Sequence, residues 1–415
     1  MQINDIIDAG KISAGAALVI PGLEGVQGTL VTRTVPYGES LRSLSRRYHI
    51  PAASLARLNH LILPTELYAG SNLIIPEMIS TTTGLKRVTL APGQSLLELA
   101  AMNDTNPWAL VQTNQLTHTW SALPEDVLFM AGNEKEVPGA LPGSISAVEI
   151  NSLPLNQGKA AVIRLSAPQG LQVSGGLMGH PLHFFYDGKG SYIALQGVHA
   201  LAEPGLYTLA ISGTLTGGMP FAFDQMVNVQ SEHYPYDRPL TVDPATIDPA
   251  VTQPEDALWT GLAQPATSQK MWEGLLKLPS SLPEDYCLET GECWSSRFGN
   301  RRSYNGSAYK YFHTGLDIVG KVGAEIYAPA SGVVVFTGPL TVRGNATMID
   351  HGWGVYTGYM HQSEILVKVG DHVETGQLIG YVGDTGRVEG PHLHWEVWVG
   401  GVQVDPMDWL TQVFP

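Results

Sequence analysis

The chain has 415 residues, more than one ordinary hydrophobic core supports, and this length suggests about three domains. Its formal net charge of −15 argues against nucleic-acid binding, which needs a basic surface. The sequence holds no run of apolar residues long enough for a transmembrane helix, so we expect no membrane span. The 46 Gly and 28 Pro residues favour many turns and short strands, hence a mainly β fold.

A repeat marks the N-terminal third of the chain. Asn4, Asn59 and Asn114 are spaced 55 residues apart, and residues 18–21 (Leu-Val-Ile-Pro) align in register with residues 73–76 (Leu-Ile-Ile-Pro). Periods of this size indicate small repeated modules.

The sequence of each repeated unit predicts a short strand, two short helices and a closing strand. Ser40 and Ser95 each follow a Pro/Gly turn, where a serine can N-cap the first helix. Leu41 and Leu44 share one face of that helix. This unit resembles the lysin motif (LysM), and the resemblance implies binding of N-acetylglucosamine-containing glycans.

We expect three copies of this module, and they differ in completeness. Residues 31–78 form the best copy, residues 85–133 a degenerate copy whose closing run lacks the proline, and residues 1–30 only the second half of a copy. Half a small module cannot bury its own core. We therefore expect the natural chain to begin upstream, with the rest of this module and a secretion signal.

The middle of the chain predicts a β-sandwich followed by a connector. Residues 142–230 contain about seven short runs of strand-forming residues separated by turns, which is typical of an immunoglobulin-like sandwich. Residues 231–295 are rich in proline and predict one helix near residues 254–263, started by Glu255 and Asp256. We expect this connector to carry no chemistry of its own.

Two cysteines lie in the connector, and the sequence leaves their state open. Cys287 and Cys293 flank a Glu-Thr-Gly-Glu turn, so they could form a small surface disulfide in an oxidising compartment. Two free thiols are an equal alternative, because two cysteines are too few for a disulfide framework.

Histidine and carboxylate residues gather between residues 313 and 394. His392 and His394 would point the same way on a strand, and His313 and Asp317 would share a face if extended or lie one turn apart if helical. His361 lies between these two motifs. A catalytic zinc takes three such ligands plus a water, so the pattern predicts a hydrolytic zinc site.

Residues 296–415 resemble the lysostaphin-type zinc endopeptidases, metallopeptidase family 23, which cut peptide bonds in peptidoglycan. The resemblance implies a mainly antiparallel β domain. It is carried by an ordered set of motifs: residues 313–317 (His-Thr-Gly-Leu-Asp), 328–332 (Ala-Pro-Ala-Ser-Gly), 350–352 (Asp-His-Gly), 359–361 (Tyr-Met-His), 382–386 (Val-Gly-Asp-Thr-Gly) and 390–394 (Gly-Pro-His-Leu-His).

The family's pattern assigns roles that spacing alone leaves open. It implies that His313, Asp317 and His394 bind one Zn²⁺ per catalytic domain, and that His361 and His392 are catalytic. One of these two histidines would act as general base, and the other would stabilise the oxyanion or protonate the leaving amine.

Other polar residues in this region receive structural or specificity roles. We expect His351 to bond within its turn and His372 to be solvated. Gln362 and residues 388–389 (Val-Glu) depart from the family's usual pattern, and we expect both to lie where substrate passes.

These observations predict a multidomain, mainly β protein that hydrolyses stem or cross-bridge peptides of peptidoglycan. The LysM-like modules would hold it on the wall glycan, in the extracellular space or cell envelope, and we expect a monomer. The alternative is a catalytically inactive wall-binding regulator of other hydrolases, although relatives of that kind typically lose zinc ligands.

Overall fold

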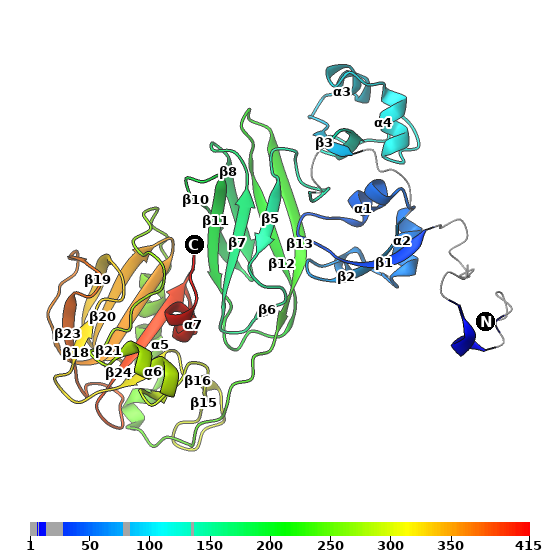
Figure 1. The fold of residues 1–415 in the computed structure, drawn as a ribbon. Coiled ribbons are helices and arrows are strands. Elements are labelled where there is room, and N and C mark those ends of the chain that lie inside the picture. Colours follow the sequence, from blue (N-terminus) through cyan, green and yellow to red (C-terminus); the bar gives the residue numbers. More distant parts are fainter. Residues whose placement is uncertain (1–5, 7, 14–27, 78–83, 134–136) are drawn as a thin grey trace. The chain divides into compact units, whose positions relative to one another are not determined.

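The computed structural model describes residue 6 and residues 8–13, 28–77, 84–133 and 137–415 (Figure 1). The chain divides into two compact units. One comprises Met1–Glu149, Leu165–Val173 and Thr208–Val227, and the other comprises Ile150–Arg164, Ser174–Tyr207 and Asn228–Pro415. No helix in the described part of the chain is long and apolar enough to cross a membrane.

Two modules with the predicted strand–helix–helix–strand order lie in the first unit. Ser40 and Ser95 each N-cap the first helix of their module by accepting a hydrogen bond from the backbone N–H three residues on, as expected. Each module has its own core, centred on Leu55 in the first and Leu110 in the second. Their elements are β1 (Thr29–Thr34), α1 (Leu41–Tyr48), α2 (Ala52–Leu58), η3 (Pro64–Glu66) and β2 (Asn72–Glu77), then β3 (Leu85–Thr89), α3 (Leu96–Met102), α4 (Pro107–Thr113) and β4 (Val127–Ala131).

The asparagine of the repeat joins the second helix of each module to its closing strand. Asn59 Nδ2 donates to the carbonyl oxygens of Leu55 and Ile74, and its Oδ1 accepts from the Ile74 N–H. Asn114 makes the same three bonds with Leu110 and Phe129. An amide side chain can donate and accept at once, which explains why asparagine recurs at this position.

Replacing Asn114 with alanine should destabilise the second module. The substitution removes the side-chain partner of the Phe129 N–H and C=O groups at a buried position, and each such loss costs about 1–3 kcal/mol; the Leu110 carbonyl keeps the backbone N–H of residue 114. Denaturant unfolding of the full chain, followed at this module by hydrogen exchange, measures the effect. Gln112→Ala, at an exposed position of α4, is the matched control and should leave exchange unchanged.

The expected half-module at residues 1–30 falls largely outside the described residues. Asn4 and residues 18–21, which carry the repeat there, are not among them. The described part of this stretch contains the short 3-10 helix η2 (Ala9–Lys11), capped by Asp8.

Residues 147–230 form two sheets with the orders β10-β11-β7-β5 and β6-β13-β12-β8-β9. Nine strands are present where about seven were expected. The immunoglobulin-like assignment stays a prediction. The strands are β5 (Ala147–Ile150), β6 (Leu155–Asn156), β7 (Ala160–Ser166), β8 (Gln172–Leu177), β9 (His180–His183), β10 (Phe185–Tyr186), β11 (Ser191–Gly197), β12 (Gly205–Thr214) and β13 (Pro220–Gln230).

The connector contains more structure than its prolines indicated. After η4 (Pro244–Ile247), helix α5 spans Pro249–Leu262 and is capped by Asp248, so the expected start at Glu255 and Asp256 is wrong. Proline favours the first turn of a helix, and here Pro249 occupies it while Pro254 lies inside. A further helix, α6 (Glu284–Thr290), was not predicted.

Cys287 and Cys293 form a disulfide, so the alternative of two free thiols is wrong. Both sulfurs belong to side chains that are buried in the main hydrophobic core of the second unit, not on the surface. The bridge ties the middle of α6 to the residue that precedes β14 (Trp294–Ser296), the first strand of the C-terminal sheet.

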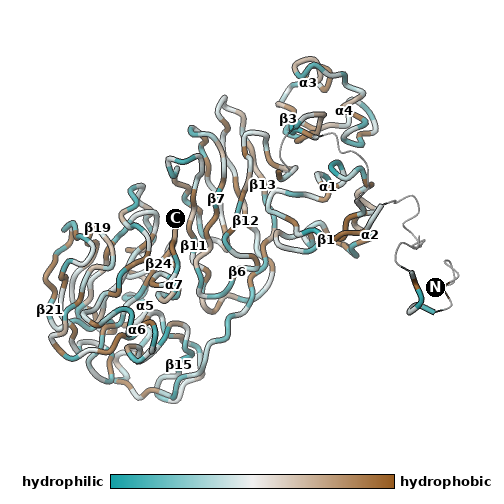
Figure 2. The backbone as a smooth tube through the Cα atoms, viewed as in Figure 1, coloured by the Kyte–Doolittle hydropathy of each residue, from teal (hydrophilic) through white to brown (hydrophobic). Residues whose placement is uncertain are grey.

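The C-terminal region is built on one ten-stranded sheet with the main path β14-β17-β24-β21-β20-β19-β22. Along β24 the apolar side chains Leu393, Trp395 and Val397 enter the core, and the alternate positions carry polar groups; Figure 2 shows such mixed hydropathy along the strands. The elements are β14 (Trp294–Ser296), β15 (Arg301–Arg302), β16 (Tyr311–Phe312), β17 (Leu316–Val319), β18 (Glu325–Tyr327), β19 (Gly332–Leu340), β20 (Gly344–Gly352), β21 (Val355–Ile365), β22 (His372–Val373), β23 (Leu378–Val382), β24 (His392–Val399), β25 (Val402–Val404) and α7 (Pro406–Thr411).

Candidate active site

Strand pairing brings the two sequence motifs together. β17 and β24 are antiparallel, and their register places Asp317 directly opposite His394. His313 precedes β17 in extended chain, so the helical alternative for this motif is wrong. Gly315 is required between them, because a Cβ there would collide with the Trp395 carbonyl and lie 2.9 Å from Nε2 of His394.

Three donor atoms converge at this point. Nε2 of His313 lies 2.9 Å from Oδ1 of Asp317 and 2.9 Å from Nδ1 of His394, and the last two atoms are 2.7 Å apart. The three side chains are buried, and they form the one such group of possible metal ligands among the described residues. Two imidazole nitrogens and a carboxylate oxygen are a donor set that zinc takes in catalytic sites.

In each imidazole, the nitrogen that faces away from the three converging atoms already has a hydrogen-bond partner. These partners decide whether the other nitrogen keeps a lone pair that can bind a metal. Nδ1 of His313 faces the carbonyl oxygen of Arg297 at 2.9 Å, so this nitrogen donates and Nε2 keeps its lone pair. Nε2 of His394 faces Oε1 of Glu396 at 3.3 Å, which leaves Nδ1 free in the same way. Both rings are therefore held in the tautomer that a metal requires, and the residues fit a bound cation.

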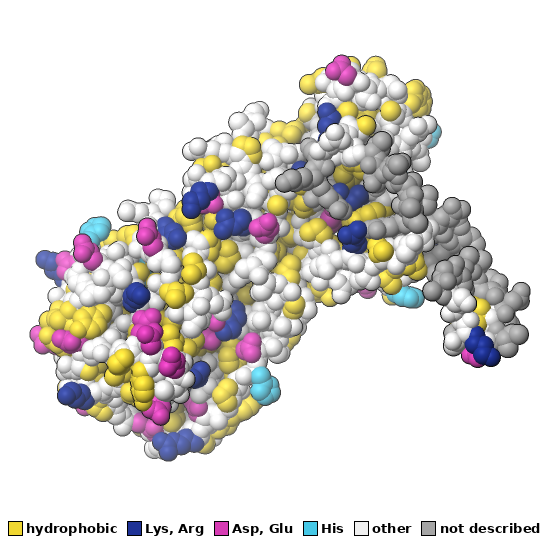
Figure 3. Space-filling model, in the orientation of Figure 1, with side chains coloured by type: hydrophobic (Ala, Val, Ile, Leu, Met, Phe, Trp, Pro, Cys, Tyr) yellow, Lys and Arg dark blue, Asp and Glu magenta, His cyan; other side chains and the backbone are white. Residues whose placement is uncertain are grey.

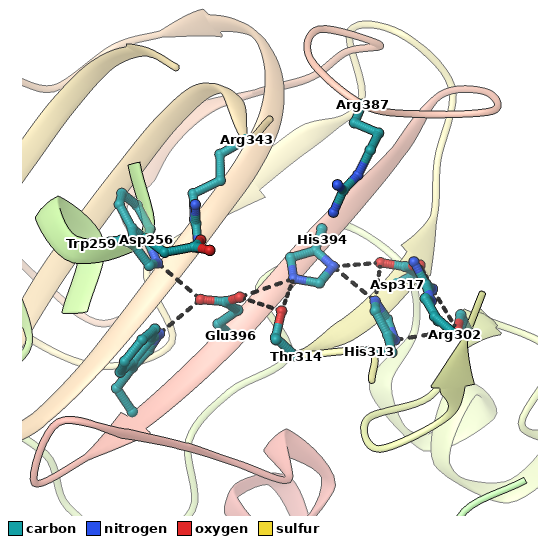
Figure 4. Close-up of polar contacts among 12 residues, drawn as sticks. Asp256, Trp259, Arg302, His313, Thr314, Asp317, Arg343, Arg387, His394 and Glu396 are labelled. Atoms are coloured by element: carbon teal, nitrogen blue, oxygen red, sulfur yellow. Dashed lines mark hydrogen bonds and ion pairs between the residues drawn. The ribbon is translucent and has the colours of Figure 1, made fainter. Parts of the chain in front are cut away.

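Glu396 is a buried carboxylate behind His394, and sequence analysis missed it. Its Oε1 accepts a hydrogen bond of 2.6 Å from Thr314, and its Oε2 accepts from the indole N–H groups of Trp259 and Trp398 at 2.9 and 2.7 Å (Figure 4). Burial alone would raise its pKa, but the hydrogen bond and charge of His394, together with Arg343, lower the pKa to about 2. Glu396 is thus ionised at neutral pH.

Helix α5, which belongs to the connector, supports this carboxylate. Its Trp259 donates to Glu396, and its Glu255 accepts from Arg343 Nη1 and from the backbone N–H of Arg343, each at 3.0 Å. Asp256 accepts from Nη2 of Arg343 at 2.9 Å. Side chains of the connector therefore support Glu396, which lies behind the possible metal ligand His394.

An arginine also binds the second carboxylate oxygen of Asp317. Arg302 Nη2 donates to Oδ2 of Asp317 at 3.3 Å, and its Nε lies 3.4 Å from Oδ2 of Asp237. Burial would raise the pKa of Asp317, but the surrounding imidazoles of His313, His392 and His394 hold it well below its usual value. Asp317 therefore presents an anionic oxygen.

The two remaining histidines lie beside the three donors. Nδ1 of His361 faces the carbonyl oxygen of Thr385 at 2.7 Å, and Nδ1 of His392 faces that of Gly390 at 2.8 Å, so each Nε2 is left unprotonated in the neutral ring. Their ring centroids are 5.0 Å apart. Burial, and then the neighbouring His394 and His392, lower the pKa of His361 to about 3, which keeps its imidazole neutral.

The backbone of β21 is strained where it presents His361. This residue has a φ of +63°, in the left-handed region that side chains rarely adopt. The register between β20 and β21 shifts at the same place, from Asn345 opposite Gln362 to Thr347 opposite Tyr359. Such a bulge redirects one side chain of a strand, and here it is His361 that is turned to the site.

All five predicted site residues line one cleft. The cleft has a volume of about 630 Å³, and Asp237, Tyr304 and Val388 are also among its lining residues. It lies wholly within the second unit. On the face of the molecule that Figure 3 shows, acidic and basic side chains are interspersed rather than gathered in one basic patch.

Four expectations about neighbouring residues have different outcomes. Gln362 is fully buried and donates to Thr347 Oγ1, so it does not lie where substrate passes. Val388 and Glu389 do line the cleft. His351 is buried on β20 and bonds Ser331 and Thr357 rather than its own turn, whereas His372 is exposed as expected.

Comparison with known proteins agrees with this site. Residues 311–406 match the Peptidase family M23 model, and residues 34–76 match the LysM domain model. The chain therefore carries a family M23 peptidase domain and, closer to its N-terminus, a LysM domain.

Two individual relatives are named as endopeptidases. Over 113 residues the chain is 43% identical to the peptidoglycan DD-endopeptidase ShyA of Vibrio cholerae, covering 27% of this chain and 26% of that protein. Over 95 residues it is 44% identical to the DD-carboxypeptidase/endopeptidase Mpg of Neisseria meningitidis, covering 23% and 22%. The matched stretch thus spans about a quarter of these curated relatives. A solved structure of the antimicrobial peptidase lysostaphin from Staphylococcus simulans is 36% identical over 24% of this chain and 43% of its own, with a TM-score of 0.23.

Proposed function

We propose that this protein is a zinc-dependent endopeptidase that hydrolyses peptide bonds in bacterial peptidoglycan. The observation that carries the proposal is the convergence of His313, Asp317 and His394 within a family M23 domain, with both imidazoles held in the metal-binding tautomer. The relatives named as peptidoglycan endopeptidases support the substrate class.

The chain's own residues supply positioning and proton transfer. A bound zinc ion would polarise the scissile carbonyl and acidify water. Nε2 of His361 and Nε2 of His392 both carry a lone pair beside the three ligands, so either can accept the proton of the attacking water. The ring that accepts this proton then carries an N–H at Nε2, which can hydrogen-bond the developing oxyanion, an effect worth roughly 3 kcal/mol, and return the proton to the leaving amine.

The LysM domain supports a location on the cell wall. We propose that residues 31–78 and 85–133 bind wall glycan and that residues 296–415 act on the peptides. Tethering a catalytic domain by weak modules raises its effective concentration at a polymeric substrate. We propose that the protein acts in the cell envelope or outside the cell, and that it acts as a monomer.

The alternative function, a catalytically inactive regulator of other wall hydrolases, is not favoured. Such a protein needs no intact ligand set. Here the three metal donors lie within 4.8 Å of one another and both further histidines adjoin them. Metal analysis separates the two, since the enzyme should hold about one zinc per chain.

Digestion of purified peptidoglycan tests the proposed activity. The full chain, loaded with zinc, should release muropeptides with newly formed peptide termini, as identified by mass spectrometry. Chelator should stop the release and added zinc should restore it, because three ligands without their metal have no Lewis acid to offer. Release that persists in chelator, or products that differ only in the glycan, would contradict the assignment.

A further inference from the structure

Four arginines line the cleft, and three of them already have carboxylate partners. Arg302 contacts Asp317 and Asp237, Arg343 contacts Glu255 and Asp256, and Arg238 at the rim lies 3.7 Å from Glu389. The fourth, Arg387, lies within 4.0 Å of no carboxylate in the described part of the chain. The cleft therefore has one cation whose charge is not balanced by a neighbour.

Neutral groups hold Arg387 in place. Its guanidinium lies 4.4 Å above the ring of Tyr304, and its Nη1 donates to the carbonyl oxygen of Thr246 at 3.0 Å. Nη2 approaches the Tyr304 hydroxyl at 3.4 Å, and the backbone N–H donates to Val342. A stacked, half-buried guanidinium loses little freedom on binding a ligand, and stacking leaves part of its donor fork available.

The position of Arg387 relates it to the reacting groups. It belongs to the loop that leads into β24, five residues before His392, and this loop lines the cleft. Figure 4 shows its side chain pointing from that loop toward the group of His313, Asp317 and His394. A substrate group that meets Arg387 would therefore be close to the scissile bond.

We propose that Arg387 binds a carboxylate of the substrate peptide next to the scissile amide, so that the enzyme prefers peptides in which this carboxylate is free. The planar guanidinium fork matches a carboxylate, and such charge-assisted bonds are about twice as strong as neutral ones. The acidic residues of the cleft are all engaged by arginine or histidine, which limits their repulsion of an anionic substrate. This inference rests on the proposed peptidase function and specifies its substrate class.

Two matched peptides test the inference. They share one cross-link and differ only in whether the carboxylate beside the scissile amide is free or converted to a carboxamide. The zinc-loaded full chain should cleave the free acid with a kcat/KM about 10- to 100-fold higher, the range expected for one hydrogen-bonded charge pair. In Arg387→Gln the ratio between the two peptides should fall close to one.

Calorimetric binding in chelator gives a second readout that does not depend on hydrolysis. Wild type should bind the free acid more tightly than the carboxamide, and Arg387→Gln should bind both alike. Lys368→Gln, which removes a positive charge from an exposed position of the same domain that does not line the cleft, should keep the wild-type preference in both assays.

The outcomes separate this inference from the proposed function. Binding that prefers the free acid, without hydrolysis of either peptide, supports the carboxylate site and contradicts the peptidase assignment. Hydrolysis of both peptides without preference supports the peptidase and overturns the carboxylate site. A preference that survives Arg387→Gln also overturns it, because another group would then bind the carboxylate.

Discussion

Replacing His313 or Asp317 with alanine should abolish zinc binding and peptidoglycan hydrolysis together. Each variant removes one of three donor atoms that lie 2.7–2.9 Å apart. Loss of a partner that only orients a ligand typically costs 10- to 100-fold in metal affinity or activity, so loss of a ligand should exceed about 100-fold. Metal analysis and muropeptide release, measured on the same preparations, check the two effects.

The control for this pair is a histidine of the same domain that does not belong to the site. His372→Ala, on the exposed position of β22, should keep both zinc and hydrolysis. Thermal unfolding of all three variants shows whether each one folds. A folded His313→Ala or Asp317→Ala protein that still cleaves peptidoglycan would disprove the ligand assignment.

Glu396→Gln should weaken zinc binding by about 10- to 100-fold, although this residue is not itself a metal ligand. The carboxylate accepts from Thr314, Trp259 and Trp398 and faces Nε2 of His394, so all its neighbours present donors or a donating ring nitrogen. A glutamine amide has one oxygen and one NH₂ group, and its NH₂ must face some of these donors. His394 would then lose the acceptor that fixes its tautomer.

Zinc affinity measured against a competing chelator checks this prediction, independently of activity. Glu364→Gln makes the same substitution at an exposed position of β21 and should leave the affinity unchanged. Unfolding in the absence of metal distinguishes the two possible roles. If Glu396→Gln lowers stability while zinc affinity stays at the wild-type value, Glu396 serves folding alone and does not position His394.

Regular local patterns were enough to predict much of the architecture. The 55-residue repeat predicted the strand–helix–helix–strand modules, because capping serines and helix-spaced leucines are local signals. The same repeat placed an asparagine at positions 59 and 114, and the structure shows its role between helix and strand. The predicted helix near residues 254–263 is present as part of α5, but its predicted start was wrong, because a proline inside a helix resembles a helix start.

The groups that surround the metal ligands could not be found in this way. Glu396 looks like an ordinary outward residue of an alternating strand, and its importance appears only when Trp259 of α5, 137 residues earlier, donates to it. Arg343 and Glu255 are 88 residues apart and meet only after the chain folds. Contacts of this range leave no periodic signal in one sequence.

What the sequence determined by itself is the chemistry: which residues form the motifs, and which donor types they offer. The alternation of β24 already required His392 and His394 to share a face, because successive side chains of a strand point to opposite sides. The tertiary structure decided how these residues are used. Antiparallel pairing of β17 with β24 sets Asp317 against His394, and hydrogen bonds to the Arg297 carbonyl and to Glu396 select the nitrogen that each ring presents. Register and tautomer depend on distant partners, so they emerge only in the folded chain.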